Sequence, residues 1–220
     1  MEKWERSVEA EKNLKSELER KEKEIEKLKK EVEELKNEVF KRERLIERLK
    51  EDLIHDDLTG LYTRKFFREF LKKELEKREG ETGSLLFGDI DDFKRINDQH
   101  GHQKGDEVLK EVGKILREST RSEDVVARWG GEEFIIFLRR AKEEYAILKA
   151  KFLKEKVKRI LTEKFGFPVS LSFGVKEIKE GEGLDELIYT VDTLMYESKK
   201  KGKDTVTAFS EIQCKEKKSS

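Results

Sequence analysis

The stretch DVVARWGGEEFIIFL, residues 124–138, decides the fold because it holds two candidate strands and the turn between them. DVVARW and EEFIIFL are rich in β-branched and aromatic residues, which favour strands. Gly130 and Gly131 separate the two segments, and a Gly-Gly pair tolerates the positive φ angles of a tight hairpin turn. The sequence therefore predicts a β-hairpin with Glu132 and Glu133 just past its turn.

A second candidate strand, SLLFGDID (residues 84–91), also ends in acids, namely Asp89, Asp91 and the following Asp92. If this strand lies beside the hairpin, Asp89 and Glu133 converge. Converging carboxylates without His or Cys partners suit Mg²⁺ bound together with substrate phosphates, and two such ions would support phosphoryl transfer. Ordinary solvated turn acids are the alternative, and the spacing does not decide between the two.

The remaining elements alternate between helices and strands. Helices are expected from the N-cap Thr63 to about Glu79, over Gly105–Thr120, from about Lys142 to Lys164, and over Leu184–Lys200; the further strands are VSLSFGVKEI (169–178) and TVTAF (205–209). This order predicts an α+β domain with a five-stranded, mostly antiparallel sheet flanked by helices.

The first fifty-odd residues carry a seven-residue repeat of apolar side chains. Its a positions are Trp4, Leu18, Ile25, Val32, Val39, Ile46 and Leu53, and its d positions include Leu14, Leu28, Leu35 and Leu49. β-branched residues at a with Leu at d favour a parallel two-stranded coiled coil, so we expect a homodimer. A solvated single helix, or one packed on its own domain, is the alternative.

Composition narrows the classes of function. Charged residues make up 45% of the chain, but 50 basic and 50 acidic residues cancel, so no field for holding nucleic acid is expected. No apolar stretch is long enough for a membrane span, and the start lacks the features of a signal peptide. The single cysteine, Cys214, cannot form an intramolecular disulfide, so we expect a cytoplasmic protein.

Six motifs, in order and at similar spacing, resemble those of the GGDEF family of diguanylate cyclases. They are DDLTGLYTR (56–64), DIDDFKRIND (89–98), GHQKGDEVL (101–109), RWGGEEF (128–134), SFGV (172–175) and YESKKKGKD (196–204). The resemblance covers about residues 55–210. It implies a ferredoxin-like domain similar to the palm of nucleotide cyclases and polymerases, with a coiled-coil helix at 1–54, a GGDEF domain at 55–212 and a flexible tail at 213–220.

The resemblance also implies an activity, the condensation of two GTP molecules into cyclic di-GMP and two pyrophosphates across a homodimer. Asp89 and Glu133 would ligate two Mg²⁺ ions through their side chains and Ile90 through its carbonyl oxygen, with Mn²⁺ as a possible substitute. Glu132 would lie nearest the attacking 3′-hydroxyl and assist its deprotonation.

Further matches concern the nucleotide. Asn97 and Asp106 match the guanine-binding pair, and a carboxylate at 106 can accept from guanine N1–H but is repelled by the N1 acceptor of adenine, so GTP should be preferred over ATP. Lys94, Lys199 and Lys203 match triphosphate-binding positions.

Two positions depart from the family pattern, since Lys203 and Asp204 stand where the family usually has Arg and Asn. Lysine keeps the charge but loses bidentate contact with phosphate, so GTP binding is expected to be weaker.

Arg121 and Asp124 form an RxxD motif at the offset that marks a product-binding inhibitory site in the family. Arginine suits planar, bidentate recognition of guanine and phosphate, which favours the inhibitory site over the alternative of a surface ion pair. His55, His100 and His102 lie in matched loops without Cys partners, so caps or loop hydrogen bonds are expected for them rather than metal ligation.

Two other functions stay open. A GGDEF module without activity could act as a receptor for GTP or cyclic di-GMP, although the metal and signature acids that such modules usually lose are present here. A coiled-coil scaffold with an incidental globular head would leave the acidic cluster unexplained. The family commonly places a sensor domain ahead of such a helix, so a sensor domain or protein is an expected partner.

Overall fold

The computed structural model describes residues 2–76 and 83–212 of the chain. Contacts divide the chain into two compact units, Met1–Glu51 and Asp52–Ser220. The predicted tail at 213–220 with Cys214, and the predicted end of the second helix near Glu79, lie outside the described residues.

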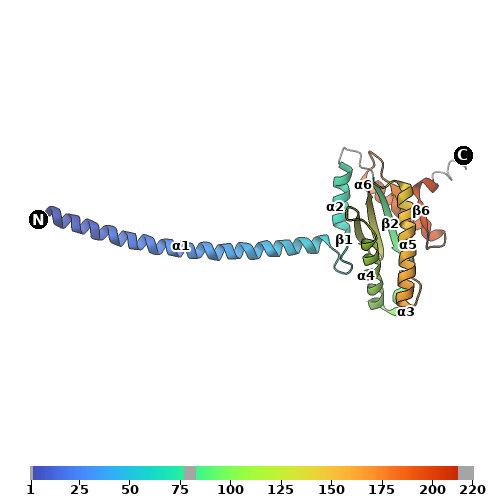
Figure 1. The fold of residues 1–220 in the computed structure, drawn as a ribbon, viewed down its shortest axis with the longest axis horizontal. Coiled ribbons are helices and arrows are strands. Elements are labelled where there is room, and N and C mark those ends of the chain that lie inside the picture. Colours follow the sequence, from blue (N-terminus) through green and yellow to red (C-terminus); the bar gives the residue numbers. More distant parts are fainter. Residues whose placement is uncertain (1, 77–82, 213–220) are drawn as a thin grey trace. The chain divides into compact units, whose positions relative to one another are not determined.

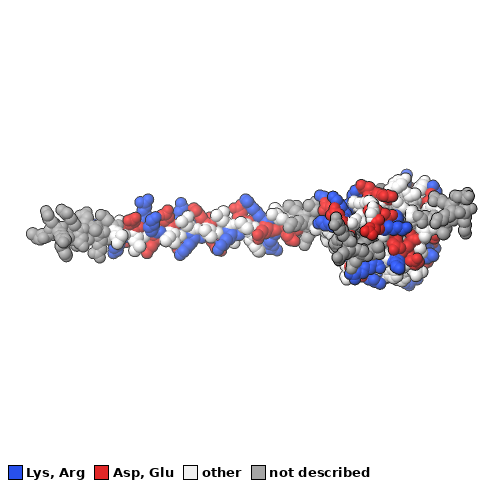
Figure 2. Space-filling model, turned by 90° about the horizontal axis from the view of Figure 1, so that it is seen from above, with Lys and Arg blue, Asp and Glu red and all other residues white. Residues whose placement is uncertain are grey.

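Helix α1 (Glu2–Ile54) forms the first unit and ends three residues past its boundary at Glu51. Aliphatic side chains of its heptad repeat are exposed in the single chain, with Ile25, Val32 and Leu35 each showing between 48% and 60% of their surface. Basic and acidic side chains are interspersed along the rest of the helix (Figure 2), for example as the Arg42–Glu38 ion pair of 2.5 Å. Burying an exposed aliphatic stripe of this kind against another apolar surface would remove it from water and so be favourable. The positions Trp4, Leu49 and Leu53 belong to the part of α1 whose side chains are not described.

The second unit is built on a mixed sheet with the order β1-β3-β4-β2-β5-β6. Its strands are β1 (Tyr62–Thr63), β2 (Gly83–Ile90), β3 (Val125–Gly130), β4 (Glu133–Arg139), β5 (Leu171–Glu177) and β6 (Val206–Ala208). The three central pairings are antiparallel, and the edge strands β1 and β6 pair in parallel. The α+β class is confirmed, with one two-residue strand more than the five expected.

Five helices flank the sheet: α2 (Arg64–Glu76), α3 (Phe93–His100), α4 (His102–Glu118), α5 (Glu143–Phe165) and α6 (Leu184–Lys200). The predicted N-cap is confirmed, because Thr63 Oγ1 accepts a hydrogen bond of 3.4 Å from the Phe66 amide. Helix α3 was not predicted, and α4 begins at His102 rather than Gly105. Gly101, with a φ of 83°, separates these two helices.

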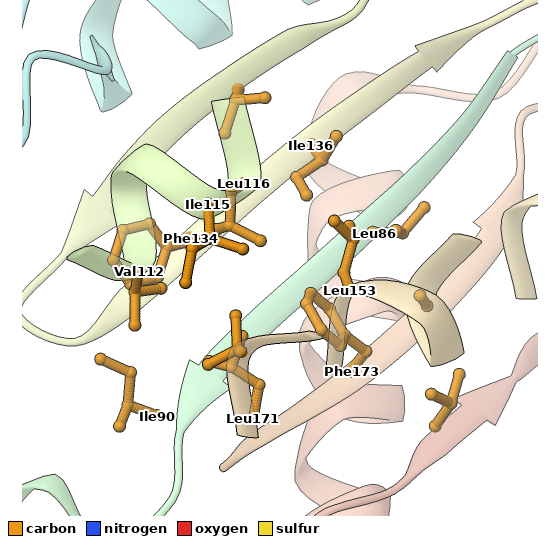
Figure 3. Close-up of a cluster of buried hydrophobic side chains, with 14 of the residues drawn as sticks. Leu86, Ile90, Val112, Ile115, Leu116, Phe134, Ile136, Leu153, Leu171 and Phe173 are labelled. Carbon is orange, nitrogen blue, oxygen red and sulfur yellow. The ribbon is translucent and has the colours of Figure 1, made fainter. Parts of the chain in front are cut away.

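The helices cover both faces of the sheet (Figure 1). Side chains alternate across each strand, so Leu86 and Ile136 point to the core beneath α3, α4 and α5, whereas Phe87 and Phe137 point to the core beneath α2 and α6. Figure 3 shows Leu86, Ile136, Phe173 and Leu153 in the first of these cores, where they are fully buried. Burial on both faces explains why the central strands are nearly continuous apolar runs.

Helix α6 packs directly on the sheet at Gly174 of β5. A Cβ atom at this position would overlap the carbonyl oxygen of Val191, so the close approach of the two backbones requires glycine. This packing brings the last turn of α6 next to the end of β2 that carries the acids, because Lys199 contacts Asp89.

Candidate active site

Strand register brings the two predicted metal-binding acids together. Asp89, near the end of β2, is the direct cross-strand partner of Glu133, the first residue of β4. The amide of Ile90 donates to the carbonyl oxygen of Glu132 at 3.3 Å, which holds the end of β2 against the signature turn. The convergence expected from the two strand ends is therefore present in the fold.

The signature turn lies one residue further along than predicted. Gly130 is the last residue of β3 and pairs with Glu133, so Gly131 and Glu132 form the turn instead of the two glycines. A register shift between Arg128 and Gly130 absorbs the extra residue. Gly131 has a φ of 32°, so it is the residue of this turn in the left-handed region, where glycine is favoured.

Burial and neighbouring acids raise the pKa of two carboxyl groups at this edge. Burial, together with Glu132 and Glu133, raises the pKa of Asp89 to about 6 even though Lys199 acts in the opposite direction. Burial, with the neighbouring charges of Asp192 and Glu132, also raises the pKa of Glu133. Such crowding disfavours the ionised carboxylates unless a cation joins them.

One cation of the chain is already present at this site. Lys199 Nζ, from the last turn of α6, lies 2.6 Å from Asp89 Oδ1. The same Oδ1 atom is buried, so this ion pair is shielded from solvent. The predicted phosphate-binding lysine thus lies against the predicted metal ligand.

The donor set fits a magnesium ion that shares its ligands with a substrate. Among the described residues, no group of three or more His, Cys, Asp or Glu side chains could hold a metal ion by itself. Asp89 and Glu133 are two carboxylates on adjacent strands, and the Ile90 carbonyl follows directly. Mg²⁺ is commonly bound by one or two carboxylates together with waters and substrate phosphates.

A second cationic group lies near the start of α3. Lys203 Nζ bonds to Asp92 Oδ1 at 2.5 Å, and Asp92, the N-cap residue of α3, has a left-handed φ of 55°. The amides of the first turn of a helix favour anions. Lys94 is exposed in this first turn, so two of the three predicted phosphate-binding lysines flank the N-terminus of α3 and the third lies on Asp89.

The predicted guanine-binding residues come from neighbouring helices. Asn97 belongs to α3 and Asp106 to α4. A Cβ atom at Gly105 would overlap Asn97 Oδ1, so the glycine before Asp106 leaves the space that the asparagine side chain occupies. Both side chains thus belong to the corner where α3 meets α4.

The RxxD motif forms a turn beside a cavity. Asp124 Oδ2 accepts from the Arg121 amide at 2.9 Å and its Oδ1 accepts from the Arg139 amide at 3.0 Å, while the Arg121 guanidinium lies over the Tyr145 ring at 5.3 Å. The cavity measures about 350 Å³ and is lined by His55, Gly60, Leu61, Tyr62, Arg117, Thr120, Arg121, Ser122, Asp124 and Val126. The Arg121 side chain pairs with Glu123 at 3.6 Å rather than closing onto Asp124.

His55 makes a contact within its loop, whereas His100 is the last residue of α3. His55 Nδ1 lies 3.2 Å from the Gly60 carbonyl oxygen, which confirms a loop hydrogen bond for this residue. His100 stacks on the Phe167 ring with 4.1 Å between centroids, a packing role that was not predicted.

Two residues at the site, Asp192 and Arg64, were not predicted from the sequence, and Asp91, which was grouped with the acids, has a different role. Asp91 is buried and accepts hydrogen bonds of 2.7 Å from both Ser170 and Ser172, so it ties the end of β2 to the start of β5 instead of joining Asp89 and Glu133. Asp192 of α6 raises the pKa of Glu133, and Arg64 lowers it. Helical spacing could have found Asp192, because it lies seven residues before Lys199 and therefore on the same face of α6.

The chain belongs to the GGDEF family, because the family model described as diguanylate cyclase, GGDEF domain, matches residues 53–205. Among curated proteins, it is 35% identical to diguanylate cyclase DgcM of Escherichia coli K12, over 77% of this chain and 42% of that protein. It is 36% identical to diguanylate cyclase A of Treponema denticola, over 73% of this chain and 45% of that protein. The chain therefore spans less than half the length of these relatives.

Solved structures extend the similarity to the helix. The coiled coil and GGDEF domain of DgcB from Caulobacter crescentus, in complex with c-di-GMP, matches 82% of this chain and 98% of its own with a TM-score of 0.77 and 28% identity. Diguanylate cyclase SiaD of Pseudomonas aeruginosa, solved with its activator SiaC, matches 92% of this chain and 79% of its own, with a TM-score of 0.68 and 32% identity. In the described part of the present chain, no helix has the length and apolar character needed to cross a lipid bilayer.

Proposed function

We propose that this protein condenses two GTP molecules into cyclic di-GMP and two pyrophosphates. The observation that carries the proposal is the cross-strand pair of Asp89 and Glu133, crowded with other acids and flanked by Lys199. Each 3′-hydroxyl attacks the α-phosphate of the other nucleotide, loses its proton and displaces pyrophosphate. The second nucleotide comes from a second copy of the chain, which the exposed heptad stripe of α1 recruits as a parallel coiled coil.

Different residues of the chain bind the guanine, bind the triphosphate and assist proton removal. Asn97 and Asp106 hold the guanine, and Lys94, Lys199 and Lys203 bind the triphosphate. Glu132, in the turn beside Asp89, assists removal of the 3′-hydroxyl proton. Asp89, Glu133 and the Ile90 carbonyl would hold two Mg²⁺ ions, with Mn²⁺ as a substitute, and the ions would supply neutralisation of the charge that develops on the phosphoryl group.

The RxxD site is proposed to bind the product and inhibit the enzyme. The cavity beside Arg121 offers space for a nucleotide base, and Arg117 adds a second guanidinium to its lining. Arg121→Ala should therefore abolish inhibition by added cyclic di-GMP and leave the initial rate unchanged. Inhibition that persists in this variant would place product binding elsewhere.

The experiment that tests the cyclase is incubation of the purified protein with GTP and Mg²⁺, followed by chromatography of the nucleotides. Cyclic di-GMP is expected from the parent and from Glu144→Ala, which removes an exposed acid of α5, and none is expected from Glu133→Ala. If the parent binds GTP but forms no product, the chain is a nucleotide receptor or needs an activating sensor.

Dimerisation has its own test. The double variant Val32→Lys, Leu35→Lys would place charge on the aliphatic stripe of α1. It should be monomeric by light scattering and should lose activity. A monomeric variant with full turnover would contradict the role of the homodimer.

A further inference from the structure

The loop after α6 is held in a strained conformation. Lys203 and Asp204 have φ angles of 66° and 47°, in the left-handed region that residues with a Cβ rarely adopt. Such a conformation persists where the surroundings impose it. The contacts of Asp204 identify what imposes it here.

Asp204 is fixed through both its backbone and its side chain. Its amide donates to the buried Asp91 carboxylate at 2.9 Å, and its own carboxylate accepts from Lys154 at 2.9 Å and from Lys158 at 2.6 Å. Both lysines belong to α5, one turn apart, so they reach the same carboxylate from one helix face.

Lys154 is unusual for a lysine because its side chain is only 11% exposed. Burial alone would lower its pKa, but hydrogen bonds to Asp204 and Glu155 raise the pKa overall, so the side chain is charged. A buried ammonium that is paired in this way is sensitive to the loss of its partner.

The strained loop carries Lys203 toward the start of α3. Lys203 bonds to Asp92, which is itself left-handed and directly precedes the first turn of α3. Asp91 directly precedes Asp92 and accepts from the Asp204 amide, so it joins the loop to the start of α3. The amide of Asp91 itself donates to the Ser170 carbonyl oxygen at 2.9 Å.

We propose that Lys154, assisted by Lys158, is a positioning residue for triphosphate binding: it clamps Asp204 and so presents Lys203 beside the N-terminus of α3. The inference rests on the proposed use of GTP. It also explains how this chain accommodates an acid where the family usually has asparagine, since the two lysines of α5 neutralise Asp204.

The test compares the affinities of purified full-length variants for GTP and for GMP, which lacks the outer phosphates, in the presence of Mg²⁺. Lys154→Met should weaken GTP binding and raise KM for GTP about tenfold, as expected for the loss of one charge-assisted hydrogen bond. GMP affinity and kcat should stay within about twofold, because the guanine-binding pair and the acids are untouched. Lys151→Met, which removes an exposed lysine of α5, is the matched control.

Two further variants guard against a simple folding defect. Lys158→Met removes a more exposed lysine, so it should fold normally and raise KM for GTP about threefold. Combining Lys154→Met with Asp204→Asn should recover much of the lost affinity, because no buried charge is left unpaired and asparagine tolerates a left-handed conformation.

Unchanged GTP affinity in folded Lys154→Met and Lys158→Met would overturn the proposal, and so would an equal loss of GTP and GMP binding. Failure of the proposed function gives a different result, namely a parent protein that forms no cyclic di-GMP. Because the comparison of GTP with GMP measures binding, it still decides the role of Lys154 in that case.

Discussion

Replacing Arg128 with Met should destabilise the fold and loosen the signature turn together. The Arg128 guanidinium donates to both Asp56 carboxylate oxygens at 3.2 Å, and its Nε and second terminal nitrogen donate to the Gly131 carbonyl oxygen at 3.0 and 2.8 Å. Burial would raise the pKa of Asp56, but hydrogen bonds from Thr59 and the charge of Arg128 lower it overall. Arg128 therefore fastens the segment before β1 to the turn that carries Glu132.

The size of the effect follows from burial. The two charged side chains are 17% and 23% exposed, between surface pairs worth up to about 1 kcal/mol and buried pairs whose disruption costs about 3–5 kcal/mol. We expect a loss of about 2 kcal/mol in the free energy of unfolding, measured by urea denaturation at one protein concentration, with an unchanged dependence on urea. Turnover should fall as well, whereas Arg159→Met, at an exposed position on α5, should change neither quantity. A loss below about 0.5 kcal/mol would refute the reasoning, because surface substitutions reach that size.

Three other predictions follow from the site. Asp89→Asn should stabilise the metal-free protein by on the order of 1–2 kcal/mol above pH 6. The pKa of Asp89 is raised to about 6, so the stability that this group gives the wild-type protein is lost as the pH rises through that value, while the loss of the Lys199 partner limits the gain. Thermal unfolding with a chelator at several pH values measures the difference between the two proteins, and a pH-independent difference would contradict the prediction. Asp106→Ala should reduce the preference for GTP over ATP about tenfold, measured by competition for binding. Gly105→Ala should weaken GTP binding because the added methyl group displaces Asn97. Normal GTP affinity in Gly105→Ala would show that Asn97 is not needed for binding. Inserting four residues into α1 should change turnover because it shifts the heptad phase, whereas inserting seven should not, and equal turnover in both would exclude a role for that phase.

The centre of the fold was predictable because its strands are long and buried on both faces. The edge strand β1 was not, since Tyr62 and Thr63 become a strand through pairing with Ala127 and Arg128, which are distant in sequence. Helix α3 was missed for a related reason: its eight residues include few buried apolar side chains, and the break at Gly101 conceals its continuity with α4.

Asp89 and Asp91 have different roles in the structure, although the sequence does not distinguish them. Asp89 and Asp91 are two residues apart on the same chain segment, and the sequence presents both as candidates for a metal site. The pairing of β2 with β4 places Asp89 opposite Glu133. Asp91 instead accepts hydrogen bonds from Ser170 and Ser172 of the neighbouring segment. The difference comes from the strand register, which no local pattern encodes.

The position of β2 in the sheet has a consequence for hydrogen exchange. Because β2 is hydrogen-bonded on both sides, to β4 and to β5, its amides should exchange with solvent through global unfolding alone. Lys203 and Asp204 lie in a loop, where smaller openings suffice. The carboxylate of Asp89 is therefore attached to the slowest-exchanging part of the molecule and Lys203 to a faster-exchanging loop, so nucleotide binding should increase protection in the loop after α6 and leave β2 unchanged.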